Sequence, residues 1–222
     1  VANMEGALVP VPTPPALVLP LIAAGGLTAL ITRALWLRGV GGLILVSALA
    51  LWALGERPLL LISGDGALVG LMTPAGRALS KPKGAGFVAQ SWLEDAVDLG
   101  DQIGAFERSG FTGQKGALQA TLAGVPVFHF TGKAASVAAL GACKEGAWVI
   151  LSADWVGSEP QGKCRVIDAK ALAVTGALAV YGEQDGLKII AARDVAGQRL
   201  WNSPARKRKP VTSAKAAETP GQ

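Results

Sequence analysis

The sequence contains a single histidine, His129, among 222 residues. A zinc hydrolase needs several neutral imidazole or thiolate ligands and an open coordination position for water, so one histidine cannot supply such a site. The chain also lacks a G-x-S-x-G nucleophile elbow, a phosphate-binding P-loop and a C-x-x-C pair. We therefore expect no metal and no cofactor, and we interpret His129 as a partly buried residue of a strand.

Charged residues are scarce as well, at 17% of the chain, and their distribution is uneven. Residues 56–204 carry fourteen Lys and Arg against fourteen Asp and Glu, so this part is neutral. Most of the net charge of +5 comes from residues 205–222, which include the basic cluster Arg206, Lys207, Arg208 and Lys209. We expect a disordered, solvated tail. The alternative is that these four cations contact DNA or anionic lipid head groups.

The acidic residues offer one weak hint of an enzyme. Five of them are candidates for a carboxylate cluster: Asp65, Glu94, Asp95, Asp98 and Asp101. Carboxylates in turns and on exposed helix faces are usually only solvated, and no local signature joins His129 to a serine and an aspartate. We therefore expect a non-enzymatic protein. The alternative is a hydrolase whose site carries no recognisable motif.

Long apolar segments dominate the first quarter of the chain, and residues 6–32 contain no charge. Two transmembrane helices are predicted, at about residues 16–37 and 39–55, each near the lower limit of ~17–25 residues for a span. The connector carries Arg33 and Arg38, and the positive-inside rule places it in the cytoplasm. A buried hairpin of a soluble protein is disfavoured because both segments are apolar all round. A signal peptide is disfavoured because no basic residue precedes the first segment.

Residues 57–204 have the pattern of one mixed α/β domain. Strands are predicted at 59–63 and 67–73 around a tight Asp65-Gly66 turn, with another turn at 74–76. A helix is expected at 86–96, followed by a loop or helical continuation to residue 110, and a hairpin is expected around Gly124. A helix over 136–140, capped near Thr131, then precedes a buried strand at 147–152. Residues 165–182 predict strand, helix and strand, and residues 187–194 close a last hairpin.

The two cysteines, Cys143 and Cys164, lie on either side of the strand at 147–152. In an oxidising compartment this pair would form a disulfide closing a loop of about 20 residues, which is worth roughly 3 kcal/mol in the chain-entropy picture. The alternative is two reduced thiols in a cytoplasmic domain. Because the predicted topology puts residues 57–204 outside the cytoplasm, we expect the disulfide.

Several stretches occur in an order that resembles one family. They are VANMEGALVPVPTPPALVLPLIAAGG, the apolar hairpin, RPLLLISGDGALVGLMTPAGRALS, GFVAQSWLEDAVD, ALGACKEGAWVIL and KCRVIDAKAL. Together they resemble the C-terminal part of ComEC-type competence proteins in their alphaproteobacterial form. The resemblance implies a multi-pass protein of the bacterial inner membrane that passes single-stranded DNA into the cytoplasm in natural transformation. It also implies a periplasmic C-terminal domain, with membrane lipids and other competence proteins as partners.

Many members of that family end in a metallo-β-lactamase-like domain with an H-x-H-x-D-H zinc motif, which this sequence lacks. No catalytic or metal residue is carried over, and the resemblance implies at most a degenerate version of that fold. Family members are several times longer, so we expect residues 1–56 to be the last membrane segment of a longer chain. The remaining alternatives are a membrane-tethered periplasmic hydrolase and a small membrane scaffold protein.

Overall fold

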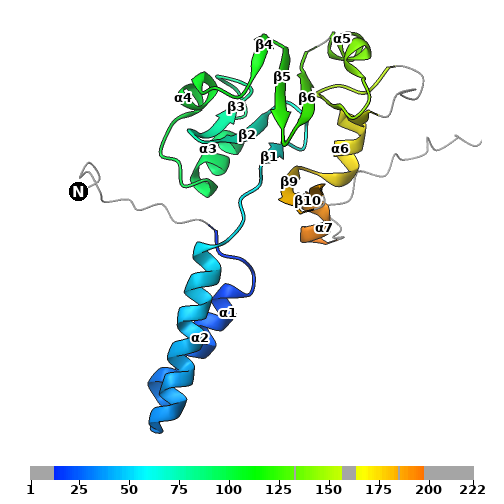
Figure 1. Cartoon of the computed structure of the whole chain (residues 1–222). Coiled ribbons are helices and arrows are strands. Elements are labelled where there is room, and N and C mark those ends of the chain that lie inside the picture. The colour runs from blue at the N-terminus through cyan, green and yellow to red at the C-terminus, as the bar shows by residue number, and fades with distance from the viewer. Residues whose placement is uncertain (1–12, 133, 157–163, 185, 198–222) are drawn as a thin grey trace, which may run out of the picture.

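The computed structural model describes residues 13–132, 134–156, 164–184 and 186–197. Within these residues the chain has two parts, a pair of antiparallel helices and a domain built on two β-sheets (Figure 1). The helices project from one end of the domain. The mixed α/β class expected for the domain is therefore confirmed.

The helical pair consists of α1 (Val18–Ile31) and α2 (Leu35–Ala53). At 1.5 Å per residue the 14 residues of α1 extend ~21 Å and the 19 residues of α2 ~28 Å. Among the described residues only α2 is long and apolar enough to cross a membrane. Trp36 belongs to α2 and does not extend the first helix. The extent expected for that helix, 16–37, is therefore wrong.

The early end of α1 has a local cause. Thr32 and Ala34 have extended backbone conformations, which stop the helix and start the next one. Arg38 Nε donates a hydrogen bond of 2.8 Å to the Thr32 carbonyl oxygen, which is one of the acceptors left free at a helix C-terminus. The two predicted connector arginines, Arg33 and Arg38, thus lie at the tip of the hairpin. There Arg38 of α2 is hydrogen-bonded to Thr32 at the end of α1.

Glycines bring the two helices into backbone contact. A Cβ added at Gly25 would lie 2.9 Å from the Gly41 carbonyl oxygen, and one at Gly41 would lie 2.6 Å from the Ala29 nitrogen. Val18, seven residues before Gly25 in α1, is buried as well, and so is Ala48, seven residues after Gly41 in α2. Close approach through small residues is how membrane helices associate, because lipid supplies no hydrophobic force between them.

The domain contains two five-stranded sheets. Sheet A is wholly antiparallel, in the order β10 (Gly186–Ala191), β9 (Leu178–Glu183), β1 (Leu60–Ile62), β2 (Val69–Thr73) and β3 (Gly76–Leu79). Sheet B is mixed, in the order β4 (Thr112–Gln114), β5 (Ala117–Leu122), β6 (Val125–Phe130), β7 (Trp148–Leu151) and β8 (Arg165–Ile167). The last three strands of sheet B run parallel.

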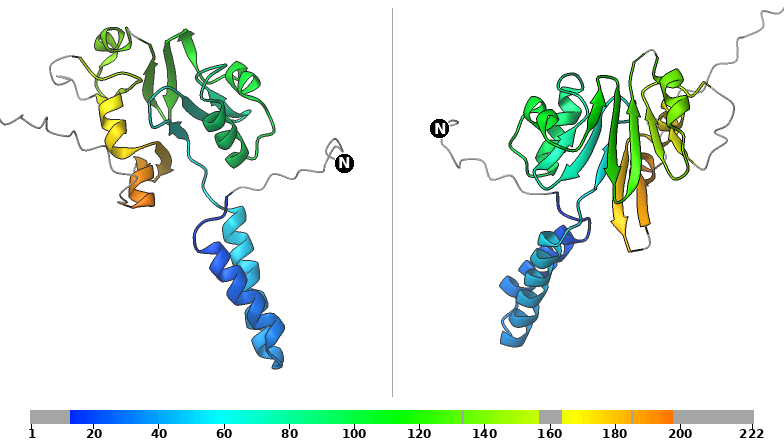
Figure 2. Two further views of the ribbon diagram at one scale, coloured as in Figure 1. Left: turned by 180° about the vertical axis from the view of Figure 1, so that it is seen from behind. Right: turned by 45° about the horizontal axis from the view of Figure 1, so that its top comes forward.

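Three apolar clusters define four layers, helix–sheet–sheet–helix. The central cluster joins side chains of both sheets, including Ile62 and Ile150. A second packs sheet A against α3 (Gly86–Asp95) and α4 (Gln102–Glu107), with Trp92 among its members. A third packs sheet B against α5 (Ala135–Ala139) and η1 (Leu140–Ala142). Figure 2 shows these helices on opposite outer sides of the sheets. Each fully buried Leu, Ile or Val adds ~1.5–3 kcal/mol of hydrophobic stabilisation.

Most of the predicted elements of the domain are confirmed. The β1–β2 hairpin with its turn at Asp65-Gly66, the turn at 74–76, α3 and the β5–β6 hairpin around Gly124 are all present. The strand at 147–152 is β7, whose four residues are all buried. The strand–helix–strand expected at 165–182 is β8, α6 (Ala169–Thr175) and β9. The last hairpin, β9–β10, is confirmed as well.

Three predictions for the domain need correction. Thr131 does not cap a helix: its backbone N–H bonds to Gly116 O at 2.9 Å and prolongs the sheet, so α5 starts only after Ala134. The segment after α3 does not continue it, because Asp101 caps the separate helix α4 through the Gly104 N–H at 2.8 Å. Residues 192–196 form the short helix α7 (Ala192–Ala196), which ends the predicted last strand early.

Arginines hold the joint between the hairpin and the domain. Arg57 Nη1 donates to the Ala96 carbonyl at 3.3 Å, and the buried Arg77 donates to the Pro58 carbonyl through Nη2 at 3.2 Å. Burial lowers the pKa of Arg77 to about 10, so it stays charged at neutral pH. In the chain segment that enters α1, the Thr13 hydroxyl donates a hydrogen bond of 2.9 Å to Asp95 Oδ1. Both chain segments that leave the hairpin are therefore fastened to the region of α3.

Candidate functional site

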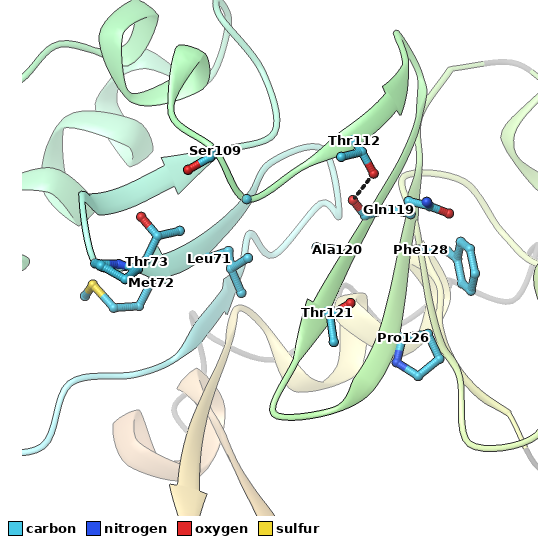
Figure 3. Close-up of a pocket in the computed structure, with 12 residues that line it drawn as sticks. Leu71, Met72, Thr73, Ser109, Thr112, Gln119, Ala120, Thr121, Pro126 and Phe128 are labelled. Atoms are coloured by element: carbon cyan, nitrogen blue, oxygen red, sulfur yellow. Dashed lines mark hydrogen bonds between the residues drawn. The ribbon is translucent and has the colours of Figure 1, made fainter.

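Two hollows are candidates for a binding site, and the larger has a cavity volume of about 580 Å³. It is a groove between β2 on one side and β5 and β6 on the other (Figure 3). Hydroxyls and apolar groups line it, such as Thr73, Thr121, Leu71 and Phe128, and no Lys, Arg, Asp, Glu or His takes part. A groove without a titratable group offers neither acid–base chemistry nor attraction for a charged ligand.

The second hollow, here called the lysine cavity, has a volume of about 520 Å³. It is lined by the segment after β3 (Ser80 to Lys83), by Lys115 and Gly116 of the β4–β5 turn, and by His129 and Thr131 at the end of β6. Strand β1 runs away from the joint, and β3, which runs in the same direction as β1, ends at Leu79 opposite Gly70. The β3–α3 segment that lines the cavity therefore begins at the end of sheet A opposite the helical hairpin, whose position Figure 1 shows.

Three lysines, Lys81, Lys83 and Lys115, belong to the lining of the lysine cavity. Within the part of the chain that the structure describes, none of the three forms an ion pair, and no Asp or Glu lines the cavity. Like charges repel one another, although Lys81 also interacts with the Asp65 carboxylate, whose pKa its charge helps to lower. The cavity is therefore a locally positive place in a domain that is neutral as a whole.

His129 forms part of the cavity wall with only 2% of its surface exposed. Its Nε2 lies 2.9 Å from the Gly66 carbonyl oxygen, and a carbonyl can only accept, so Nε2 carries the proton of the neutral ring. Burial lowers the pKa of His129 to about 4, and the nearby Lys81 charge acts in the same direction. The other ring nitrogen, Nδ1, is buried and has no hydrogen-bond partner in the structure.

The Ser63–Gly66 stretch forms the turn whose Gly66 carbonyl accepts the hydrogen bond from His129. Ser63 Oγ donates to Asp65 Oδ1 at 2.6 Å and accepts from the Leu68 N–H at 2.9 Å. Partial burial of Asp65 favours its neutral form, but the hydrogen bonds from Ser63 and Ala67 outweigh it and lower its pKa. These polar groups form a turn, as predicted.

The five acidic candidates do not come together as one group. Asp65 lies in the β1–β2 turn, Asp101 caps α4, and Glu94 accepts from Gln90 at 2.9 Å on the exposed face of α3. Asp98 accepts from the Arg108 guanidinium, which holds the pKa of Asp98 below its usual range. Across the described ranges, no group of three His, Cys, Asp or Glu side chains is placed to hold a metal ion.

Cys143 and Cys164 are bonded to each other, with 5.4 Å between their Cα atoms and 21 residues of separation. The predicted disulfide is therefore present, and it ties the end of η1 to the start of β8. The basic cluster at Arg206, Lys207, Arg208 and Lys209 lies outside the described residues.

Sequence reasoning missed the lysine cavity, because a neutral total charge hides a local excess of one sign. Lys81 and Lys83 flank one proline, and Lys115 is more than thirty positions away in another turn. The β3–α3 segment and the β4–β5 turn meet only after the two sheets have packed. The K-P-K-G sequence at residues 81–84 was the one available signal, and it is too short to be specific.

No protein-family model matches this sequence, and comparison with curated proteins and with solved structures gave no significant match. The likeness to ComEC-type proteins therefore remains a prediction from the order of the sequence stretches.

Proposed function

We propose that this chain is the C-terminal part of an inner-membrane competence protein of the ComEC type. In this proposal the two-sheet domain is a non-catalytic periplasmic element of a channel for single-stranded DNA. Membrane lipids surround the hairpin, and other membrane helices and competence proteins complete the channel. The observation that carries the proposal is the apolar hairpin joined directly to a disulfide-bonded domain.

The surface of the hairpin supports the membrane part of the proposal. Large apolar side chains cover its outside and are strongly exposed, including Leu30, Leu35 and Leu43 at 81%, 81% and 68%. A water-soluble protein rarely leaves such a patch uncovered. Because α1 is ~21 Å long, it is shorter than the ~30 Å hydrocarbon core. The proposal therefore has α1 packed among further helices, as in a multi-pass protein.

The disulfide supports the periplasmic side of the proposal. Disulfides persist in oxidising compartments such as the bacterial periplasm and are rare in the cytoplasm. The tip of the hairpin carries Arg33 and Arg38, which favours a cytoplasmic tip. Both arguments, one from the sheet domain and one from the hairpin, support a periplasmic domain.

The layers of the domain are compatible with a degenerate metallo-β-lactamase-like fold, which the proposal includes. Two facing sheets covered by helices on both outer sides fit that interpretation. The position of His129 fits a structural role: its ring is buried and its Nε2–H bonds to a backbone carbonyl. We therefore propose a domain that supports or gates the channel and makes no cut in the DNA.

A transformation assay in the native host tests this function. Cells with an in-frame deletion of the sequence encoding residues 13–197 receive homologous DNA that carries a resistance marker. Transformants are expected to fall to background, whereas electroporation of the same DNA, which bypasses uptake, gives equal numbers in both strains. Equal transformation frequencies in the deleted and wild-type strains would contradict the proposal.

A further inference from the structure

The lysine cavity has the electrostatics of an anion site. Its three cations come from two separate turns, the Lys81-Pro82-Lys83 segment and the β4–β5 turn with Lys115. Nothing in the fold of either turn requires lysine, because Lys83 and Lys115 are exposed and form no described ion pair. Three lysines around one cavity repel one another, and an anion bound among them would offset that repulsion. The absence of a lining carboxylate means that no residue of the cavity would repel that anion.

The apolar walls of the cavity restrict the class of ligand further than the positive charge of the cavity does. Phe106, Leu118 and Pro82 contribute apolar surface, which inorganic phosphate would not use. A volume of about 520 Å³ lies within the ~300–1,000 Å³ range of small-molecule sites. A ligand that fits must therefore combine a negatively charged group with a flat or apolar body.

Hydrogen-bonding groups complete the lining. Ser80 Oγ accepts from the Val69 N–H at 2.9 Å and keeps its own hydrogen to donate. The Thr131 hydroxyl is also part of the lining. The buried His129 Nδ1 is an acceptor without a partner. Ammonium and hydroxyl donors suit phosphate oxygens.

We propose that the lysine cavity binds one nucleotide unit, with its phosphate among Lys81, Lys83 and Lys115 and its base or sugar against Phe106 and Leu118. The chemical class is a nucleoside monophosphate, presented either free or as the end of a single strand. The proposal deepens the suggested role in DNA uptake and rests on it for the source of the ligand. It adds a binding site to a domain that the uptake proposal treats only as support.

Calorimetry on the purified full chain tests the site. The chain is placed in nanodiscs of zwitterionic phosphatidylcholine, so that no anionic lipid competes, and is titrated with thymidine monophosphate, thymidine or inorganic phosphate. Thymidine monophosphate is expected to bind tightest, with phosphate weaker and thymidine weakest. The affinity is expected to fall as salt rises, because the charges are partly exposed. A dodecamer of thymidylate with a terminal phosphate distinguishes a strand end from a free nucleotide.

Charge-matched variants locate the binding. K83A/K115A removes two exposed cations of the cavity, and K170A/K188A removes two exposed cations elsewhere. The first is expected to weaken thymidine monophosphate at least about tenfold and the second less than about twofold, if two neighbouring ammonium groups each contribute modestly. F106A is expected to weaken thymidine monophosphate and leave inorganic phosphate unchanged. Equal melting temperatures show that the variants fold.

Three results would overturn the inference: no heat with thymidine monophosphate, equal losses in the two lysine pairs, or phosphate binding as tightly as the nucleotide. Failure of the site is distinguishable from failure of the uptake function. A purified chain that binds nothing leaves the transformation result standing. If a deletion strain still takes up DNA, a measured affinity for the nucleotide remains valid. Only the proposal that the nucleotide comes from incoming DNA is then lost.

Discussion

Gly66 and His129 connect the two sheets at the level of single residues. Gly66 has φ +65°, and a Cβ there would lie 2.3 Å from the Leu151 carbonyl oxygen of β7. Its own carbonyl accepts the hydrogen bond from His129 on β6. The β1–β2 turn of sheet A thus sits directly on two strands of sheet B. This contact between the sheets fixes the position of the β1–β2 turn, although the turn carries no catalytic group.

Gly66→Ala and Gly124→Ala separate the close approach from the backbone strain. Both glycines have positive φ, but a Cβ at Gly124 would meet nothing within 4 Å. G124A is expected to lower the free energy of unfolding by about 1–2 kcal/mol from the left-handed conformation alone. G66A is expected to cost at least about 2 kcal/mol more, because the turn must move away from β7. Urea unfolding of both variants measures the difference, and equal losses would contradict the packing described.

The buried neutral ring of His129 predicts a pH dependence of stability. The ring has an ordinary pKa of 6.5 in the unfolded chain and a pKa of about 4 in the folded domain. Between these values the unfolded state binds more protons, so the free energy of unfolding falls as the pH is lowered from 6.5 towards 4. Between pH 7.5 and pH 5 the loss is expected to be about 2 kcal/mol.

His129→Gln is the matched control for this effect, because glutamine does not titrate and its amide N–H can bond to Gly66 O. Urea midpoints of the two proteins at pH 7.5 and pH 5 give the comparison. Carboxylates such as Asp98 contribute equally to both proteins in this range. A histidine protein that loses no more stability than H129Q on acidification would show that the ring is solvated or already charged.

Among the helices and strands, the sequence predicted those whose own residues show a clear helical or strand pattern. The β5–β6 hairpin has alternating side chains around Gly124, and α3 has apolar residues at helical spacing. The short strands β3 and β4 were not predicted, because three or four residues carry too little periodicity and are held in place by their neighbours. The extent of α1 was also missed, because the apolar Trp36 and Leu37 that follow Arg33 fit either helix by composition alone.

The helical hairpin allows a test with two adjacent glycines. A Cβ at Gly41 would lie 2.6 Å from the Ala29 nitrogen of α1, whereas a Cβ at Gly42 would meet nothing within 4 Å. G41I is expected to separate the helices and G42I to leave them in place. Spin labels on cysteines at Leu19 and Leu49, both exposed, report the distance in micelles. A longer and broader distribution in G41I alone is expected, and unchanged distances in G41I would contradict the glycine contact.

The disulfide is an element-scale staple with a predictable contribution. Closing a loop of 21 residues is expected to stabilise the domain by roughly 3 kcal/mol. C143A/C164A is therefore expected to unfold at lower urea concentration than the wild type. Reductant is expected to destabilise the wild type and not the variant, because the sequence has no other cysteine. Equal urea midpoints for oxidised wild type and variant would show that the bond contributes nothing to the stability.

At the scale of the whole molecule, the joint decides how the domain is presented to the membrane. Arg57 and Arg77 fasten the chain leaving α2, and Thr13 fastens the chain entering α1. These contacts keep the hairpin at one end of the sheets, whereas the segments that line the lysine cavity lie towards the other end (Figure 1). In a periplasmic domain the cavity would face away from the bilayer. Sequence could predict the two parts and their order, but not which end of the sheets would carry the cavity.

The central claim is that the hairpin and domain form the end of a multi-pass inner-membrane protein. The most direct measurement is an immunoblot of native membranes, washed with alkaline carbonate, using an antibody against residues 57–197. The account predicts a band in the membrane pellet that is several times heavier than 22.6 kDa, the mass of this chain. A band near 22.6 kDa, or one released into the supernatant, would contradict it.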